Sequence, residues 1–141
     1  MAGLTSQLFR GGLSALWFSG AARATSRWTA GKGAVLMLHR VQPEARVEFA
    51  PNAALSITPR YLERLICSFR AADLDIVSLD EALQRVAAPA RTRRFVCFTF
   101  DDGYRDNLQH AAPVFQRHGA PFTVYATSSF HERTFAPWWC A

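Results

Sequence analysis

Four apolar segments of strand length alternate with helical patterns along the chain, and this alternation limits the possible folds more than any other feature. The segments between them carry apolar residues at the i, i+3, i+4, i+7 spacing of one buried helical face. Strands that alternate with helices pair in parallel through right-handed crossovers. The sequence therefore predicts a parallel α/β sheet with crossover helices. The expected strands cover Ala34–Leu38, Ile76–Val77, Phe95–Phe100 and Phe122–Ala126.

The expected helices carry recognisable start and stop signals. Thr58-Pro59 places an N-capping residue before a proline at the first helical position. Ser78-Leu-Asp-Glu81 has the spacing of a capping box. A third helix is expected to begin near Pro113 and to stop at Gly119. Residues 41–57 are expected to form a loop.

The third predicted strand ends abruptly in Asp101, Asp102 and Gly103. Asp and Gly are ordinary turn residues, so the triplet alone is most often a loop. Here it follows a strand that is apolar on both faces, and two adjacent acids repel each other unless a cation relieves them. Gly103 frees the backbone to turn sharply. The pattern favours metal-assisted hydrolysis, in which one carboxylate binds a divalent ion and the other takes a proton from water.

The segment Phe98-Thr-Phe-Asp-Asp-Gly103 resembles the first signature motif of the polysaccharide deacetylase family, the nodulation-protein-B-like carbohydrate esterases of family 4. The resemblance extends over about residues 34–139 and holds in order and spacing. Other similar segments are Leu36–Val41, Ile57–Pro59, Val77–Leu83, Tyr104–Asn107 and His110–Tyr125.

The resemblance implies an α/β fold that is the N-terminal half of a deformed (β/α) barrel, with about four parallel strands. It implies a hydrolase that removes acetyl groups from N-acetylated oligo- or polysaccharides. By the same resemblance, Asp101 would be the general base and Asp102 a ligand of a divalent metal, with zinc the first choice.

The second half of the family's metal site is absent from the sequence. The family supplies two histidines in an H-x-x-x-H arrangement, and no two histidines of this chain are four residues apart. A complete (β/α) barrel is typically about 250 residues long. We therefore expect residues 34–141 to be a partial domain, truncated at its C-terminal end, that is inactive alone. The alternative is a non-catalytic carbohydrate-binding or structural remnant of the same fold.

Three further residues are candidates for substrate binding, each with a structural alternative. His39 follows the first strand and could line the sugar cleft or hydrogen-bond the barrel rim. Tyr104 could touch substrate or pack as an aromatic at the rim. Trp138 could stack on a sugar ring or belong to the core.

Polar residues around the carboxylates also allow two interpretations. Arg40 could pair with Asp101 or Asp102, or be solvated. Asp106 and Asn107 are typical of a turn or a helix cap, and the structural role is favoured.

The net charge of +5 is concentrated near the N-terminus. The chain has 16 basic and 11 acidic residues. Outside the N-terminal excess of five, 11 basic and 11 acidic residues balance, which argues against a broad nucleic-acid-binding face. Five basic residues precede the first acid, Glu44, and account for the excess: Arg10, Arg23, Arg27, Lys32 and Arg40.

Residues 1–33 form a basic, partly apolar segment with two interpretations. It could be a weak secretory signal with Leu13–Ala22 as its apolar stretch, which would imply export. It could instead be an amphipathic helix that lies against the protein or an anionic membrane surface. The helix is favoured because Ser14, Ser19 and Gly20 interrupt the apolar stretch. A cytoplasmic or membrane-peripheral location follows from that choice, and the oligomeric state is left open.

The cysteine pattern does not indicate a disulfide framework. There are three, without a C-x-x-C pair, which argues against structural disulfides and a zinc knuckle. Cys67 and Cys97 lie in apolar patterns and are expected to be small core residues.

Overall fold

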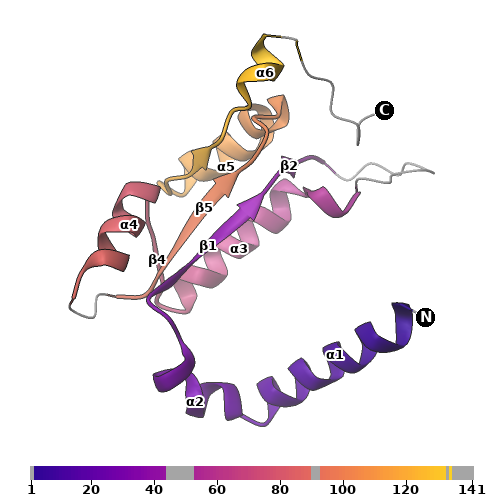
Figure 1. Cartoon of the computed structure of the whole chain (residues 1–141), viewed down its shortest axis with the longest axis vertical. Helices are drawn as coiled ribbons and strands as arrows, with labels where there is room; N and C mark the ends of the chain where they lie inside the picture. The colour runs from indigo at the N-terminus through magenta and orange to yellow at the C-terminus, as the bar shows by residue number, and fades with distance from the viewer. Residues whose placement is uncertain (1, 44–52, 90–92, 133, 135–141) are drawn as a thin grey trace. The chain divides into compact units, whose positions relative to one another are not determined.

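The computed structural model describes residues 2–43, 53–89, 93–132 and 134 (Figure 1). The chain divides into two compact units, Met1–Gly31 and Lys32–Ala141. The first unit contains helices α1 (Ala2–Phe18) and α2 (Ala21–Thr29), separated at Gly20, whose φ of 74° is left-handed. The first unit therefore consists of two helices.

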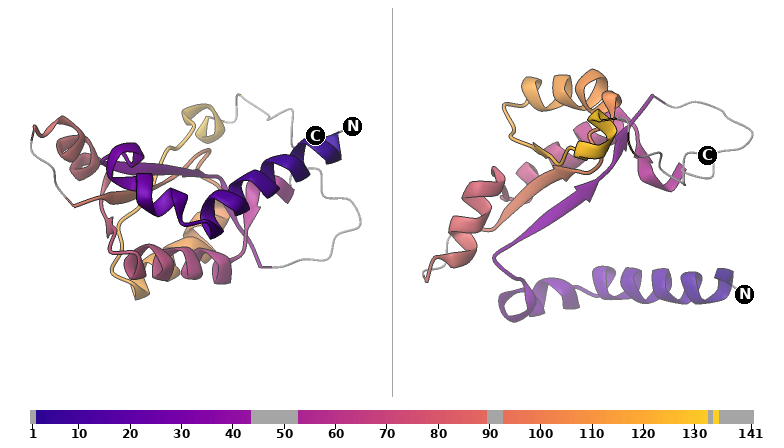
Figure 2. Two further views of the ribbon diagram at one scale, coloured as in Figure 1. Left: turned by 90° about the horizontal axis from the view of Figure 1, so that it is seen from below. Right: turned by 45° about the horizontal axis from the view of Figure 1, so that its top comes forward.

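The second unit is built on a parallel sheet whose central strand is β5 (Phe95–Phe100). Strand β1 (Gly33–Leu38) pairs with β5 along its whole length, and the two run side by side in Figures 1 and 2. The other edge of β5 is shared between β4 (Asp75–Ile76) at its start and β6 (Thr123–Val124) at its end. The predicted parallel α/β class and its four strands are confirmed.

Residues 41–57 are not all loop, which corrects the prediction for that segment. Strands β2 (Arg40–Val41) and β3 (Ser56–Ile57) pair in parallel as a second small sheet, and the 3-10 turn η1 (Ala53–Leu55) precedes β3. No apolar pattern indicated this pairing, because each strand has only two residues. Residues 44–52 between them lie outside the described residues.

The helices of the second unit begin where the capping signals indicated. Helix α3 (Pro59–Ala71) follows Thr58, whose side-chain oxygen accepts a hydrogen bond from the Tyr61 backbone N–H at 3.1 Å. Helix α4 (Leu79–Ala87) follows Ser78, whose hydroxyl accepts one from the Glu81 N–H at 3.2 Å. A π-helical turn η2 (Asn107–Ala111) leads into α5 (Ala112–Arg117), and α6 (Ser128–His131) comes last.

Strand β5 lies between two groups of buried side chains, and every one of its six residues is buried. Alternate residues of a strand point to opposite faces. One face packs against α3 and α5, and the other packs against Ala82 of α4. The larger cluster comprises Val41, Leu62, Ile66, Val96, Phe98, Phe100, Ala111, Val114, Phe115 and Ala120.

Two cysteines differ in a way the apolar pattern did not predict. Cys97 belongs to the smaller cluster with Phe95 and is fully buried, and burial raises the pKa of its thiol. Cys67 is exposed on α3, so the prediction that it is a core residue is wrong. Its neighbour Ile66 occupies the buried helical face instead.

The two faces of strand β1 differ in how far the described residues of its own unit bury them. Leu36 and Leu38 pack against the larger cluster, whereas Val35 and Met37 are 55% and 65% exposed.

No helix among the described residues is long and apolar enough to cross a membrane.

Candidate active site

The two predicted site carboxylates lie where β5 ends, at the carboxyl edge of the sheet. The Asp101 backbone N–H donates to the Leu38 carbonyl at 2.9 Å, and the Tyr125 N–H donates to the Phe100 carbonyl at 2.7 Å. Asp101 is therefore fixed next to the end of β1, close to the point where β6 leaves the sheet. Ligands of parallel α/β sheets commonly bind outside this edge.

The backbone turns sharply immediately after Asp101. Asp102 and Gly103 both adopt left-handed conformations, with φ of 68° and 63°. Aspartate is one of the few residues with a side chain that tolerates this region. A Cβ at Gly103 would lie 3.4 Å from Ala126 Cα, which is an ordinary contact, so the left-handed backbone rather than lack of space favours glycine here. The turn leaves Asp101 and Asp102 partly exposed, as a site that meets substrate requires.

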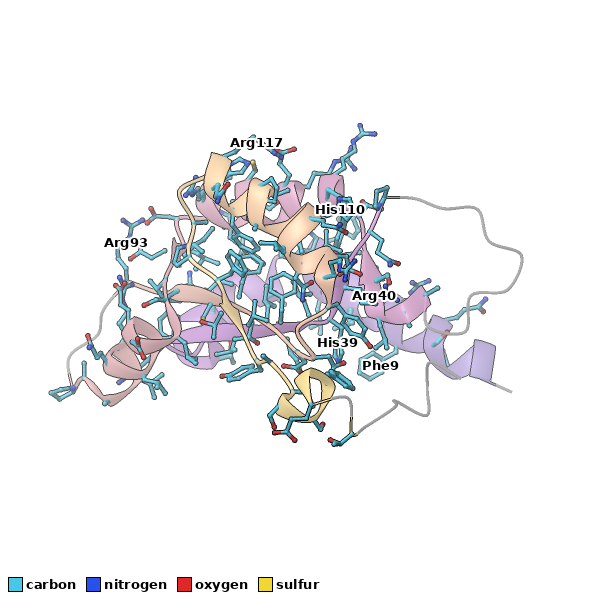
Figure 3. All side chains as sticks on the ribbon, turned by 90° about the horizontal axis from the view of Figure 1, so that it is seen from above. Phe9, His39, Arg40, Arg93, His110 and Arg117 are labelled. Atoms are coloured by element: carbon cyan, nitrogen blue, oxygen red, sulfur yellow. The ribbon has the colours of Figure 1, made fainter. Side chains whose placement is uncertain are left out.

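The His39 side chain lies beside Asp101. Its Nε2 lies 4.0 Å from the Asp101 Oδ2, and the two side chains are 22% and 31% exposed. This distance is too long for a hydrogen bond. The structure nevertheless brings the two predicted residues together at one edge of the sheet, and Figure 3 shows His39 beside Arg40 there.

Arg40 pairs with neither of the two site carboxylates but with Asp106. The Arg40 Nε donates to the Asp106 Oδ2 at 2.9 Å, and the Val41 N–H donates to the Oδ1 at 3.2 Å. The Asp106 side chain is only 8% exposed. Asp106 stands at the N-cap position of η2 but its side chain makes no capping hydrogen bond there, so its structural contacts are those with Arg40 and Val41. Its carboxylate joins the segment after β1 to the segment after the Asp-Asp-Gly turn.

Tyr104 lies against this ion pair. The Arg40 guanidinium carbon is 4.7 Å from the centroid of the Tyr104 ring, within cation–π range. This contact supports the packing interpretation of Tyr104. Trp138 lies outside the described residues.

The burial of Asn107 was not expected from the sequence. It is 3% exposed at the start of η2, and neither its amide nitrogen nor its amide oxygen has a partner among the described residues. A buried amide is costly when it is unpaired. The described residues therefore leave both polar atoms of the Asn107 amide without a hydrogen bond.

Among the remaining histidines, His118 pairs with a glutamate of α3 and not with these carboxylates. His118 Nε2 lies 3.1 Å from the Glu63 Oε1. That hydrogen bond, helped by Arg117, holds the pKa of the Glu63 carboxyl below its usual value. This pair joins α5 to α3, so it is structural. The side chain of His131 is outside the described part of the chain.

The described residues do not fit a complete zinc site. No three His, Cys, Asp or Glu side chains among them gather closely enough to hold a metal ion. Catalytic zinc takes three protein ligands and a water molecule. Asp102 and Asp101 therefore supply at most part of a ligand set.

A polar hollow lies at the edge of the sheet where β5 begins, and charged side chains that line it pair with one another. Arg85 donates to Asp75 at 2.7 Å and to Glu81. Arg93 pairs with Asp73 and Asp75, and Figure 3 places it at the far end of the unit from His39. Hydrogen bonding to Asp75 raises the pKa of the Arg85 guanidinium. We assign this hollow a structural role.

Comparisons with known proteins agree with this geometry. The family model for polysaccharide deacetylases matches residues 88–137, which include the Asp-Asp-Gly turn. A search of curated proteins finds no match. The solved structure of IcaB from Ammonifex degensii is 27% identical, with a TM-score of 0.57, and the alignment covers 67% of this chain and 38% of that chain.

Two further solved structures share the fold. A de-N-acetylase from Aggregatibacter actinomycetemcomitans is 18% identical with a TM-score of 0.56, covering 71% of this chain and 39% of that chain. The Streptococcus pyogenes deacetylase PplD, solved with acetate, is 21% identical with a TM-score of 0.57, covering 77% and 48%. The chain thus spans less than half the length of these three structures. The predicted resemblance to part of a polysaccharide deacetylase is confirmed.

Proposed function

We propose that this chain, which resembles the polysaccharide deacetylases in sequence and fold, carries part of the active site of a metal-dependent deacetylase. The reaction is hydrolysis of the N-acetyl amide of N-acetylated oligo- or polysaccharides. The observation that carries the proposal is the Asp101-Asp102-Gly103 turn at the carboxyl edge of the sheet, inside the residues that the family model matches.

Asp101 is the proposed general base. It takes a proton from the water that attacks the acetyl carbonyl carbon, and the C–N bond then breaks to give acetate and the sugar amine. The partly exposed carboxylate at the end of a buried strand supports this role, because it is fixed by the backbone and reachable by water. Asp102 is the proposed ligand of a divalent metal, with zinc the first choice, and the other ligands must come from outside the described residues.

His39 is the proposed substrate-side neighbour of the base. Its place 4.0 Å from Asp101 supports contact with the sugar or with the attacking water. Tyr104, held by Arg40 at the same edge, is the weaker candidate for substrate contact. Trp138 stays a sequence-based candidate for stacking on a sugar ring.

The second candidate function is carbohydrate binding without catalysis. The absence of a three-ligand metal cluster among the described residues favours it for this polypeptide taken alone.

The test is an acetate-release assay on the longest polypeptide that the gene encodes, with N-acetylglucosamine oligomers as substrate and zinc supplied. Loss of a general base lowers kcat by about 10²–10⁴-fold, and Asp101→Asn is expected to do so with KM little changed. Asp102→Asn is expected to weaken zinc binding measured by calorimetry. The matched control is Asp80→Asn, an exposed carboxylate in the first turn of α4, which should leave both quantities unchanged.

Two outcomes would reject the catalytic proposal. One is equal activity of the Asp101→Asn and Asp80→Asn variants. The other is a long gene product that binds the oligomers and never releases acetate, which would establish the binding function instead.

A further inference from the structure

Helix α1 carries a group of large apolar side chains that are exposed. At about 100° per residue, five of the seven large apolar positions of α1 fall within roughly half of the helix circumference, whereas positions 4 and 18 fall outside that half. Gln7, Arg10 and Ser14 occupy the other half, and Phe18 at the helix end lies outside the apolar arc. The apolar arc comprises Leu8, Phe9, Leu13, Leu16 and Trp17, which are 54% to 72% exposed.

The charge of the same unit has one sign. Arg10, Arg23 and Arg27 lie within it, and no acidic residue precedes Glu44 in the sequence. The other two early basic residues are already engaged in the second unit. Lys32 Nζ donates to the Val86 and Ala88 carbonyls at 2.7 and 2.5 Å, and Arg40 is paired with Asp106.

The helix is too short to span a bilayer. Its 17 residues extend for about 25 Å at roughly 1.5 Å per residue, whereas the hydrocarbon core is about 30 Å thick. Arg10 also lies near its middle. Arg10, the only charged residue of α1, falls at the border of the apolar arc, next to the position of Trp17. A helix that lies in the plane of the membrane–water interface can place such an arginine at the level of the headgroups.

We infer that the unit Met1–Gly31 binds the surface of an anionic lipid membrane, with the apolar arc of α1 inserted among the acyl chains. Arginine side chains near an anionic surface are attracted to the lipid headgroups. Trp17 suits the interface because its ring is apolar and its indole N–H is polar. A second copy of the chain could also cover an apolar arc, but its own Met1–Gly31 unit carries the same arginines without an acid. The inference is independent of the proposed deacetylase function.

The test is co-sedimentation of the full 141-residue chain with phosphatidylcholine vesicles that contain or lack about a third of phosphatidylserine. Binding is expected only with the anionic lipid and should weaken as salt rises, because exposed charges are then screened. Phe9→Glu is expected to weaken partitioning on the order of tenfold or more, since burying a Phe side chain contributes about 1.5–3 kcal/mol. Gln7→Glu adds the same charge on the polar half of the helix and is the matched control.

Arg10→Gln separates charge from apolar insertion. It is expected to weaken binding to the anionic vesicles about fivefold, from about 1 kcal/mol per arginine near the surface. The inference is overturned if the chain does not sediment with anionic vesicles. It is equally overturned if Phe9→Glu and Gln7→Glu weaken binding by the same factor, or if Phe9→Glu only dissociates a dimer in analytical ultracentrifugation.

Discussion

At the scale of single residues, the Asp106 carboxylate links two segments that flank the candidate active site. It accepts hydrogen bonds from Arg40 and from the Val41 N–H, so the segments that follow β1 and β5 are joined behind Asp101. Both bonds involve a nearly buried carboxylate, and removing it leaves the Val41 N–H buried and unpaired. The cost of such a group is larger than the average worth of one hydrogen bond.

Replacing Asp106 with Ala is expected to lower the free energy of unfolding by about 1–3 kcal/mol, the range for a lost buried hydrogen-bonding partner. Urea denaturation followed by circular dichroism measures the change. Asp106→Asn keeps an oxygen for the Val41 N–H and should cost less. Equal losses for the two variants would contradict the role given to that hydrogen bond.

The two described cysteines give a second prediction at this scale. Cys97 is fully buried and the pKa of its thiol is raised by burial, because the charged thiolate is disfavoured there. Cys67 is exposed. In a Cys140→Ser background, a thiol reagent at about pH 8 should label Cys67 in the native protein. Cys97 should be labelled only after unfolding, and mass spectrometry that finds both labelled under native conditions would contradict its burial.

At the scale of elements, β5 organises the second unit, because helices pack on both of its faces and three strands pair with it. Its continuous apolar run is typical of a strand buried on both faces. The polar residues that follow it are therefore set on a rigid support. The helices around it depend on their capping residues for where they begin.

Ser78→Ala is expected to destabilise the protein by about 1 kcal/mol, because the N-terminus of α4 loses the side chain that accepts from Glu81. Ser68→Ala is the matched control. Ser68 is exposed inside α3 and its hydroxyl donates only to the Arg64 carbonyl, so its removal should change stability by less than about 0.5 kcal/mol. A thermal melt in which both variants lose the same stability would contradict the capping role.

At the scale of the whole molecule, the candidate site is recognisable and its metal ligands are not all among the described residues. The chain covers less than half the length of the three related structures, and Val35 and Met37 of β1 have no cover among the described residues. Binding energy for a metal ion depends on the number of ligands that are held in place.

The 141-residue polypeptide alone is therefore expected to bind zinc more weakly than micromolar and to release no acetate from N-acetylglucosamine oligomers. Isothermal titration calorimetry and an acetate assay on the purified chain measure both quantities. Micromolar or tighter zinc binding together with turnover would show that residues outside the described ranges complete the site.

The sequence alone determined the order and class of the elements. Apolar periodicity predicted the parallel sheet, and the side chains of Thr58 and Ser78 predicted where two helices begin, because these signals act over a few neighbouring residues. The Asp101-Asp102-Gly103 turn was predicted for the same reason, since only residues that tolerate a left-handed backbone suit it.

Only the tertiary structure decided which distant side chains meet. Arg40 pairs with Asp106 across 66 residues of sequence, and His39 faces Asp101, because the pairing of β1 with β5 brings their carboxyl ends to one edge. The two-residue strands β2 and β3 likewise form because distant segments of the chain pair with each other. Asp106 was expected to serve a turn or a helix cap, because local spacing shows a residue's nearest neighbours and not the buried ion pair that it forms with Arg40.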